Sequence, residues 1–306
     1  MAKTHTLEIV PSGAPLGHEI RGIDLSAPLA PETVGAISAA WAAHGVIVLR
    51  GQNLSPARQV EVSRQFGTLE RFSIGAYNQP EHPEIFVVSN IVEQGRPIGI
   101  ADAGRDWHTD MCFTPNPPRG SLFYALEVPQ QNGQPRGDTV FASTGAAYDA
   151  LPDDIRQRID GRLATFSFAN RVAIAAREKA LAERPHGDED DPLLQAHLQA
   201  EREKALAKHP DVWHPIVRHH PLTGRKCLYM SELHTTRIEG IPQPESDALL
   251  AYLNAHVVRP EFVYRHRYQP GDVVFWDNCA CIHKAIGDFA LPLRRHMHRT
   301  TIGSWQ

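Results

Sequence analysis

The C-terminal segment constrains the fold of this chain most, because strand-favouring runs alternate in it with turn-favouring residues. Residues 273–276 (VVFW) and the Thr/Ile run at residues 300–302 are typical of β-strands. The glycine, aspartate and proline between the two runs favour turns. A strand, a loop and a returning strand would therefore place His283 close to the arginine pair at residues 294–295.

The returning strand itself carries cationic side chains. Because side chains alternate along a strand, Arg295, Met297 and Arg299 share one face, and the two histidines between them share the other. Two arginines on one face are costly to bury unless they meet anions. The segment therefore predicts that His283 and two anion-binding arginines face one cavity.

Short strand-like runs continue through the rest of the chain. Those bounded by turn residues lie at residues 7–25, 45–50, 84–90, 121–128, 137–143, 216–231 and 262–268. Helix-like runs lie at residues 31–43, 54–66, 146–159 and 246–256, the second of them with a Ser-Pro start typical of a helix N-terminus. Many short strands and few helices predict a mainly β fold with flanking helices, as a sandwich or a closed double sheet.

Length and composition describe an ordinary globular chain. We interpret residues 1–306, with 42% hydrophobic and 22% charged residues, as a single domain. The net charge of −4 gives no overall basic surface, which argues against a nucleic-acid partner. The N-terminus lacks the apolar core of a signal peptide, and no run is long enough to span a membrane. The four cysteines are poorly spaced for a disulfide framework, so we expect a cytoplasmic protein.

One segment departs from the β pattern. Residues from about 171 to 210 are rich in Ala, Glu, Lys and Arg, with the acidic stretch RPHGDEDDP in the middle. The composition predicts two polar helices joined by an acidic loop. We interpret this segment as a solvated insertion at the surface; the alternative is a lid over the active site.

A second informative stretch, WHTD, holds candidate metal ligands. In extended backbone His108 and Asp110 point to the same face, so an imidazole nitrogen and a carboxylate oxygen can share one ion. The pair alone is a common pattern, but with His283 it makes the two-histidine, one-carboxylate facial triad of non-haem Fe(II) oxygenases. Such a triad leaves one face of the ion open to a 2-oxo acid, whose distal carboxylate Arg295 could bind with its guanidinium fork.

The remaining candidates have simpler interpretations. Cys279 and Cys281 could form a zinc cluster beside His283, but no second pair at zinc spacing accompanies them, so we interpret them as core cysteines. The other candidates are assigned structural roles: a polar strand edge for residues 218–220, an exposed loop for His234, and core packing near the metal for Trp107 and Trp276.

The motifs WHTDMCF, PRGDTVFAS, HPLTGRKCLYMS, PGDVVFWDN and RRHMHRTTI, in this order and with His283 before the last, resemble the taurine dioxygenase / 2,4-dichlorophenoxyacetate dioxygenase family of Fe(II)/2-oxoglutarate oxygenases. The likeness runs from Val46 to Ile302. It implies a double-stranded β-helix (jelly-roll, cupin-like) fold, with Fe(II), 2-oxoglutarate as cosubstrate and O2. The implied reaction is a hydroxylation that releases succinate and CO2. Cleavage of a C–O, C–S or C–N bond would follow where the carbon bears a heteroatom.

The resemblance also implies roles for single residues. The iron would be held by His108, Asp110 and His283, 2-oxoglutarate by Thr139 and Arg295, and an acidic substrate group by Arg299. Alternatively, Arg299 pairs with an acidic side chain or with the inner carboxylate of the cosubstrate. Where the taurine enzyme binds its substrate with a histidine and a tyrosine, this chain has Phe72 and Gly75. We therefore expect Phe72 to bind the substrate, a small or medium organic anion (a carboxylate, sulfonate or sulfate ester) other than taurine.

Two other functions stay open for such a chain. A metal hydrolase or isomerase on the same barrel would not need Thr139 or Arg295. A non-catalytic ligand-binding barrel would be expected to have lost a metal ligand or the cosubstrate arginine, and this chain has lost neither. The expected partner is a small-molecule anionic substrate, without nucleic acid or membrane. A homo-oligomer, either a dimer or a tetramer, is a further expectation.

Overall fold

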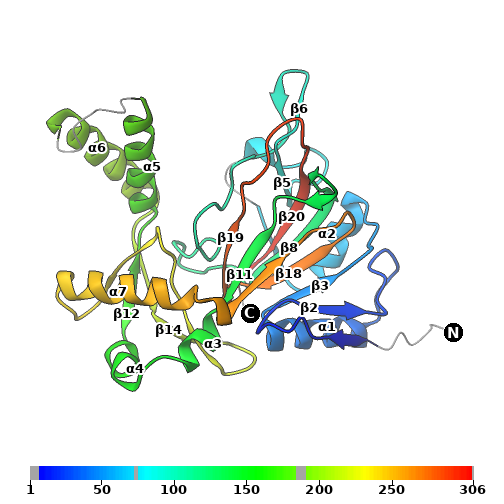
Figure 1. The fold of residues 1–306 in the computed structure, drawn as a ribbon, viewed down its shortest axis with the longest axis horizontal. Coiled ribbons are helices and arrows are strands. Elements are labelled where there is room, and N and C mark those ends of the chain that lie inside the picture. The colour runs from blue at the N-terminus through cyan, green and yellow to red at the C-terminus, as the bar shows by residue number, and fades with distance from the viewer. Residues whose placement is uncertain (1–6, 72–74, 184–190, 305–306) are drawn as a thin grey trace.

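The computed structural model describes residues 7–71, 75–183 and 191–304 (Figure 1). Its largest sheet has eight strands, and within the described residues only β2 and β3 are parallel neighbours in it. The strands run in the order β1 (Glu8–Val10), β2 (His18–Arg21), β3 (Val46–Leu49), β18 (Val273–Asp277), β8 (Gly120–Glu127), β20 (His296–Ile302) and β4 (Leu69–Glu70), and β5 (Ile85–Ser89) also pairs with β20. The predicted mainly β fold with flanking helices is confirmed.

Smaller sheets and hairpins complete the β structure. One three-stranded sheet has the order β17 (Val263–His266), β11 (Thr139–Ser143), β19 (Cys281–Ala285), and another has the order β13 (Val212–Pro215), β12 (Leu163–Phe166), β16 (Thr235–Ile238). Hairpins join β14 (Val217–His219) to β15 (Lys226–Leu228), β9 (Gln130–Gln131) to β10 (Gln134–Pro135), and β6 (Val92–Glu93) to β7 (Arg96–Pro97). The predicted hairpin within residues 216–231 is confirmed.

The strand of His283 and the returning strand of the arginines lie in different sheets, which corrects the simple strand–loop–strand prediction. Strand β19 pairs with β11, whereas β20 pairs with β8, β5 and β4. The two sheets face each other across a shared apolar cluster that contains Phe123 and Val274 of the large sheet and Phe141 of the small one. His283 and the arginines are therefore brought together across this interior rather than along one ladder.

Helices flank the large sheet. Helix α1 (Pro31–His44) packs on β3 and β18, and α2 (Pro56–Arg64) packs on β20. The hydroxyl of Ser55 accepts a hydrogen bond from the backbone N–H of Arg58, with Pro56 at the first helical position, as the sequence predicts. Each helix buries one apolar face, since Trp41 and Val62 belong to a cluster that also includes Phe275 of the sheet.

The second half of the chain adds further helices around the smaller sheets. Helix α7 (Gln243–Val257) begins slightly earlier than expected and packs on β16. The prediction of a single helix at residues 146–159 is wrong. The structure has two helices there, α3 (Thr144–Asp149) and α4 (Asp153–Ile159). Pro152 separates them, because a proline disfavours helical backbone at the residue before it.

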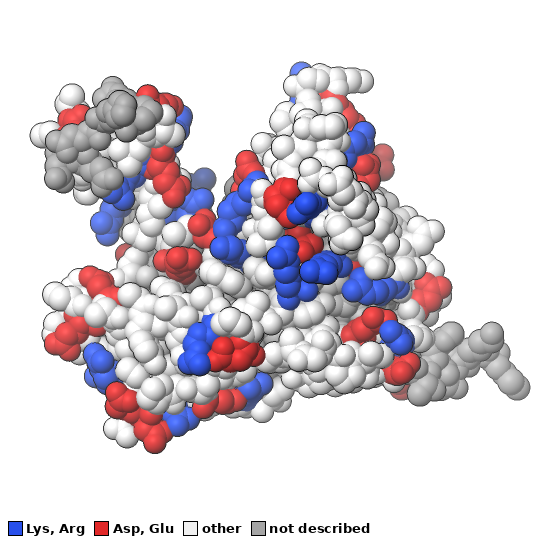
Figure 2. All heavy atoms as spheres, viewed as in Figure 1, with Lys and Arg blue, Asp and Glu red and all other residues white. Residues whose placement is uncertain are grey.

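The polar segment from about 171 to 210 forms the predicted pair of helices, α5 (Phe168–Glu183) and α6 (Pro192–Lys208). The two helices pack chiefly on each other and stand apart from the sheets, and they carry both signs of charge (Figures 1 and 2). Most of the acidic loop between them, residues 184–190, lies outside the described residues. No helix in the described ranges has the length and apolar character needed to cross a membrane.

Candidate metal centre

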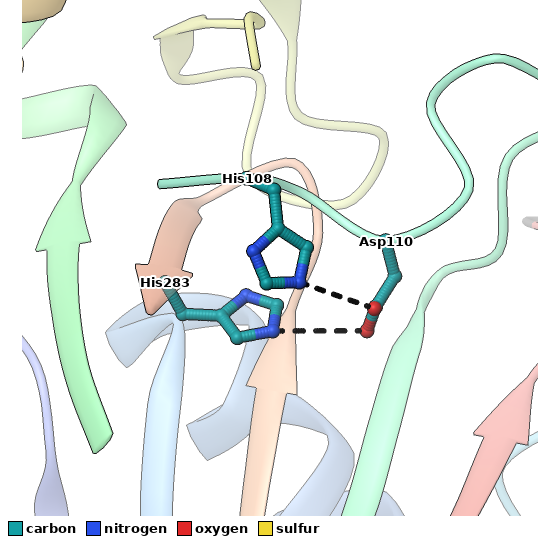
Figure 3. A group of neighbouring side chains, drawn as sticks. All are labelled: His108, Asp110 and His283. Carbon is teal, nitrogen blue, oxygen red and sulfur yellow. Dashed lines mark ion pairs between the residues drawn. The ribbon is translucent and has the colours of Figure 1, made fainter. Parts of the chain in front are cut away.

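The three candidate ligands meet in the interior, and two of them are joined by their backbones. The N–H of His108 donates to the carbonyl of His283 at 3.0 Å, and the N–H of His283 donates back to the carbonyl of His108 at 2.8 Å. The two imidazole rings lie side by side with their centroids 4.2 Å apart (Figure 3). A short antiparallel bridge thus fixes two segments that are remote in sequence.

Asp110 completes the group. Its Oδ1 lies 3.8 Å from His108 Nε2, its Oδ2 lies 4.0 Å from His283 Nε2, and the three ligand atoms all lie within 4.8 Å of one another (Figure 3). The other ring nitrogen of His108, Nδ1, lies 2.8 Å from the carbonyl oxygen of Asp106, so it carries the proton and leaves the lone pair on Nε2. Two imidazoles and a carboxylate are the donor set of a non-haem Fe(II) site, and these residues fit such an ion.

The charge states suit metal binding. Burial raises the pKa of Asp110, but the Arg299 guanidinium, the two histidines and the Trp276 indole together hold that pKa well below its usual value. Burial lowers the pKa of His283 to about 3, so its imidazole is neutral near pH 7. The protein therefore presents an ionised carboxylate beside a neutral imidazole, which are the forms that bind metal ions.

Both oxygens of Asp110 also accept hydrogen bonds from the surrounding protein. Trp276 Nε1 donates to Oδ2 at 3.1 Å, and Arg299 Nη1 donates to Oδ1 at 3.0 Å. The prediction of core packing for Trp276 is incomplete, since its buried ring also orients a candidate ligand. Arg299 is predicted to bind the substrate or, alternatively, to pair with an acidic side chain or the cosubstrate. The structure shows the pairing with an acidic side chain, that of Asp110. Sequence periodicity held no signal for either contact, because both cross between elements remote in sequence.

A cavity of about 240 Å³ opens beside the three candidate ligands. Thr139, Arg295 and Arg299 lie on its wall, so both predicted arginines face one cavity. Most of the remaining wall is apolar, with contributions from Phe86, Val88, Ile100, Met111, Phe113 and Phe123. Phe72, expected to bind the substrate, lies outside the described residues.

Arg295 is a buried cation on the wall of this cavity. It is 4% exposed, and burial lowers its pKa. Among the described residues no carboxylate forms an ion pair with it; aromatic rings surround it instead, those of Phe123, Tyr268 and Phe289 with centroids 5.6–5.8 Å from the guanidinium carbon. The hydroxyl of Thr139 lies 3.0 Å from that of Tyr268. A buried guanidinium without a counter-ion is costly, so the cavity around Arg295 suits an anionic ligand.

Two histidine interpretations are wrong. His234 is not exposed: it lines the cavity, its Nδ1 lies 2.9 Å from the Ser231 hydroxyl, and its ring stacks on Phe113 at 5.3 Å. His220 is not at a polar edge: it is buried, with Nε2 3.2 Å from an oxygen of Asp277. Both errors have one cause, since Phe113 beside His234 and Asp277 beside His220 come from distant segments.

The interpretation of Cys279 and Cys281 as core cysteines is confirmed. Both are buried free thiols, as are Cys112 and Cys227.

Phe113 on the cavity wall contacts Phe168, the first residue of α5, at a ring separation of 4.7 Å. The base of the α5–α6 pair therefore touches the wall of the cavity, although the helices themselves stand apart from the sheets.

Comparisons with known proteins agree with this geometry. A family model described as taurine catabolism dioxygenase TauD, TfdA family matches residues 8–301. The chain is 31% identical over 280 residues to pentalenolactone F synthase of Streptomyces arenae (90% of this chain, 89% of the relative). It is 32% identical over 294 residues to the alpha-ketoglutarate-dependent 2,4-dichlorophenoxyacetate dioxygenase of Cupriavidus pinatubonensis (92% of each chain). It is 32% identical over 290 residues to the alpha-ketoglutarate-dependent sulfate ester dioxygenase of Pseudomonas putida (94% of this chain, 87% of the relative).

Solved structures give the same result. The fold is similar to the crystal structure of a taurine dioxygenase from Burkholderia xenovorans, with a TM-score of 0.76 and 29% identity over 98% of this chain and 90% of the other. It is also similar to AAD-2 in complex with Mn(II) and N-oxalylglycine, with a TM-score of 0.74 and 26% identity over 98% of each chain. The chain therefore belongs to the TauD, TfdA family, and it is a dioxygenase that depends on Fe(II), 2-oxoglutarate and O2.

Proposed function

We propose that His108, Asp110 and His283 hold the iron, and that the adjoining cavity binds 2-oxoglutarate together with a small or medium organic anion. The observation that carries this proposal is the buried Arg295, a cation with no carboxylate partner among the described residues, in the same cavity as three metal donors. When bound, Fe(II) with 2-oxoglutarate and O2 supplies the oxidising chemistry that hydroxylates a substrate C–H bond and releases succinate and CO2.

The residues of this chain bind and orient the reactants. The guanidinium of Arg295 would grip the distal carboxylate of 2-oxoglutarate through a bidentate, charge-assisted pair. The hydroxyl of Thr139, already within hydrogen-bond distance of Tyr268, would add one bond to the same carboxylate. Trp276 keeps the Asp110 carboxylate turned toward the two histidines. The aromatic rings around Arg295 exclude water, which strengthens the ionic contact.

The substrate side of the cavity favours an anion with an apolar body. Arg299 supplies a cation on the cavity wall, and the surrounding side chains are mainly aliphatic or aromatic. Two of the relatives act on 2,4-dichlorophenoxyacetate and on sulfate esters, as their names state. We infer the same class here: a carboxylate, sulfonate or sulfate ester bound by Arg299 and Phe72, with loss of a C–O, C–S or C–N bond where the hydroxylated carbon bears a heteroatom. Taurine is not expected as the substrate.

The architecture and setting follow from the same inference. The large sheet and the β17–β11–β19 sheet would be the two halves of a double-stranded β-helix, since they face each other across one apolar cluster. Residues 1–306 would form a single domain, with the α5–α6 pair as an insertion at its surface. The four free thiols suit a reducing cytoplasm.

A substrate panel tests the proposal. Fe(II)-loaded enzyme is incubated with 2-oxoglutarate, O2 and, in turn, phenoxyacetate, hexyl sulfate, an N-substituted amino acid and taurine. We expect substrate-dependent succinate from an aryloxy acid or an alkyl sulfate and none above background from taurine. Efficient turnover of taurine would contradict the expectation, based on Phe72 and Gly75, that taurine is not the substrate. Turnover of any compound without 2-oxoglutarate would favour a metal hydrolase or isomerase instead.

A further inference from the structure

Arg299 is placed where it can meet either Asp110 or a ligand. It lies on β20 between two neighbouring strands, opposite Phe86 of β5 and Phe123 of β8. Its guanidinium carbon lies 5.4 Å from the centroid of the Phe86 ring, and Nη1 donates to Asp110 Oδ1 at 3.0 Å. The same side chain lines the cavity. Because pairing on both sides fixes the backbone of Arg299, any exchange of partner must come from its side chain.

The two oxygens of Asp110 have partners of different charge. Oδ2 accepts from the neutral donors Trp276 Nε1 at 3.1 Å and Ser121 Oγ at 3.4 Å. Oδ1 accepts from the cationic Arg299. The side chains of Asp110 and Arg299 are only 5% and 11% exposed. Solvent therefore screens this pair weakly, and a charge added beside it will be felt strongly.

A divalent cation held by Asp110 changes the balance. In the metal-free protein Arg299 is the cationic hydrogen-bond donor to Asp110, and the other donors to this carboxylate are neutral. A bound dication shares that carboxylate and repels the nearby guanidinium. Arg299 would then be a largely buried cation whose counter-ion is partly withdrawn, and such a cation favours a new anion.

We propose that Arg299 links the metal to the substrate: Asp110 neutralises it in the metal-free protein, and metal binding to Asp110 turns it into the receptor for the anionic group of the substrate. This inference rests on the proposed function, in which the substrate is an organic anion. By linkage, the metal strengthens anion binding by the same factor by which the anion strengthens metal binding. An anionic substrate should therefore prefer the metal-loaded protein even where the anion does not touch the metal.

The test measures binding rather than turnover. Hexyl sulfate is the probe, because a sulfate ester is a poor metal ligand, and hexan-1-ol is its neutral counterpart. Their dissociation constants are measured by calorimetry with metal-free and Mn(II)-loaded protein, without 2-oxoglutarate. We expect Mn(II) to tighten hexyl sulfate binding by a factor within the roughly 5–150-fold range of coupled sites and to leave hexan-1-ol unchanged.

Variants test whether the metal strengthens anion binding through Arg299 or through direct contact between the anion and the metal. Asp110→Asn removes the competing charge, so the metal-free variant should bind hexyl sulfate more tightly than metal-free wild type. Arg299→Met should bind it weakly and without dependence on Mn(II). Glu127→Gln is the control for net charge, because Glu127 pairs with Arg294 at the exposed end of the same strand pair. This control should behave as wild type. Circular dichroism tests whether each variant is folded. If Asp110→Asn does not fold, the proposal is tested by the comparison of wild type with Arg299→Met.

Equal hexyl sulfate affinities in metal-free wild type and folded Asp110→Asn would overturn the link, as would a full Mn(II) effect in Arg299→Met. Either result is compatible with succinate formation from an organic anion, so the proposed function would survive it. A failure of the proposed function looks different. No anion in the panel would then yield succinate, and metal-loaded wild type would not bind hexyl sulfate, which would remove the link as well.

Discussion

His108 and His283 face each other through a pair of backbone hydrogen bonds, at 3.0 and 2.8 Å, that needs neither side chain. The two candidate ligands come from segments far apart in the chain, and this bridge sets their imidazoles side by side. The metal centre is therefore built on main-chain geometry, with the side chains added to it. Changes at the ligands should consequently affect metal binding far more than the fold.

His283→Ala should abolish measurable Mn(II) binding while the protein stays folded. The bridge to His108 persists, and the lost packing against Phe141 and Trp276 should cost about 1–3 kcal/mol of unfolding free energy. Calorimetry gives the metal affinity, and circular dichroism with urea titration gives the stability. His219→Ala, at an exposed position of β14, is the control. Normal metal affinity in folded His283→Ala would remove this residue from the metal site.

Arg295→Leu should weaken 2-oxoglutarate binding much more than Thr139→Val. Loss of a buried charged partner costs about 2–5 kcal/mol, whereas loss of one neutral hydrogen bond costs about 0.5–1.5 kcal/mol. Dissociation constants are measured with Mn(II)-loaded protein. Arg294→Leu is a matched control, since the neighbouring arginine is exposed and pairs with Glu127. Small and equal effects at residues 295 and 139 would mean that the cosubstrate binds elsewhere.

Gly104→Ala should lower metal affinity through His108. A Cβ at residue 104 would lie 2.8 Å from His108 Cε1 and 3.4 Å from Nε2, so the imidazole must move. Gly95→Ala is the matched control, because its φ of +77° resembles the +70° of Gly104 but its Cβ would meet nothing within 4 Å. Both variants should lose about 1–2 kcal/mol of stability from the left-handed backbone. Only Gly104→Ala should also bind Mn(II) more weakly; equal Mn(II) affinities would contradict the steric argument.

The metal-free protein should lose stability as the pH falls below about 6.5. Burial lowers the pKa of His234 to about 3 and that of His298 to about 4. Between pH 6.5 and 4 the unfolded chain therefore binds protons at these histidines that the folded protein does not. Each such group lowers the unfolding free energy by about 1.4 kcal/mol per pH unit in that window, and the loss is absent above pH 7. Urea titrations at pH 7, 6 and 5 measure the slope, and His298→Gln should reduce it.

The sequence alone determined the local elements and the residue types of the site. Continuous apolar runs predicted strands such as β3 and β5, and the Ser-Pro start predicted the beginning of α2. The alternation of side chains predicted Arg295 and Arg299 on one face, and both line the cavity, Arg299 from β20 and Arg295 from the position just before it. These features depend on neighbours along the chain, so periodicity and spacing contain them. The break at Pro152 was also present in the sequence as a local signal.

Which segments meet depends on the fold and not on any local pattern. Strand β19 joins a different sheet from β20, and the backbone bridge from His108 to His283 spans two elements that no local pattern relates. The same holds for the burial of His220 and His234 and for the bonds from Trp276 and Arg299 to Asp110. The sequence does not distinguish a polar side chain that contacts water from one that contacts a buried partner. Its role is decided by groups that folding brings from elsewhere in the chain, and this is why the partners of Asp110 could not be predicted.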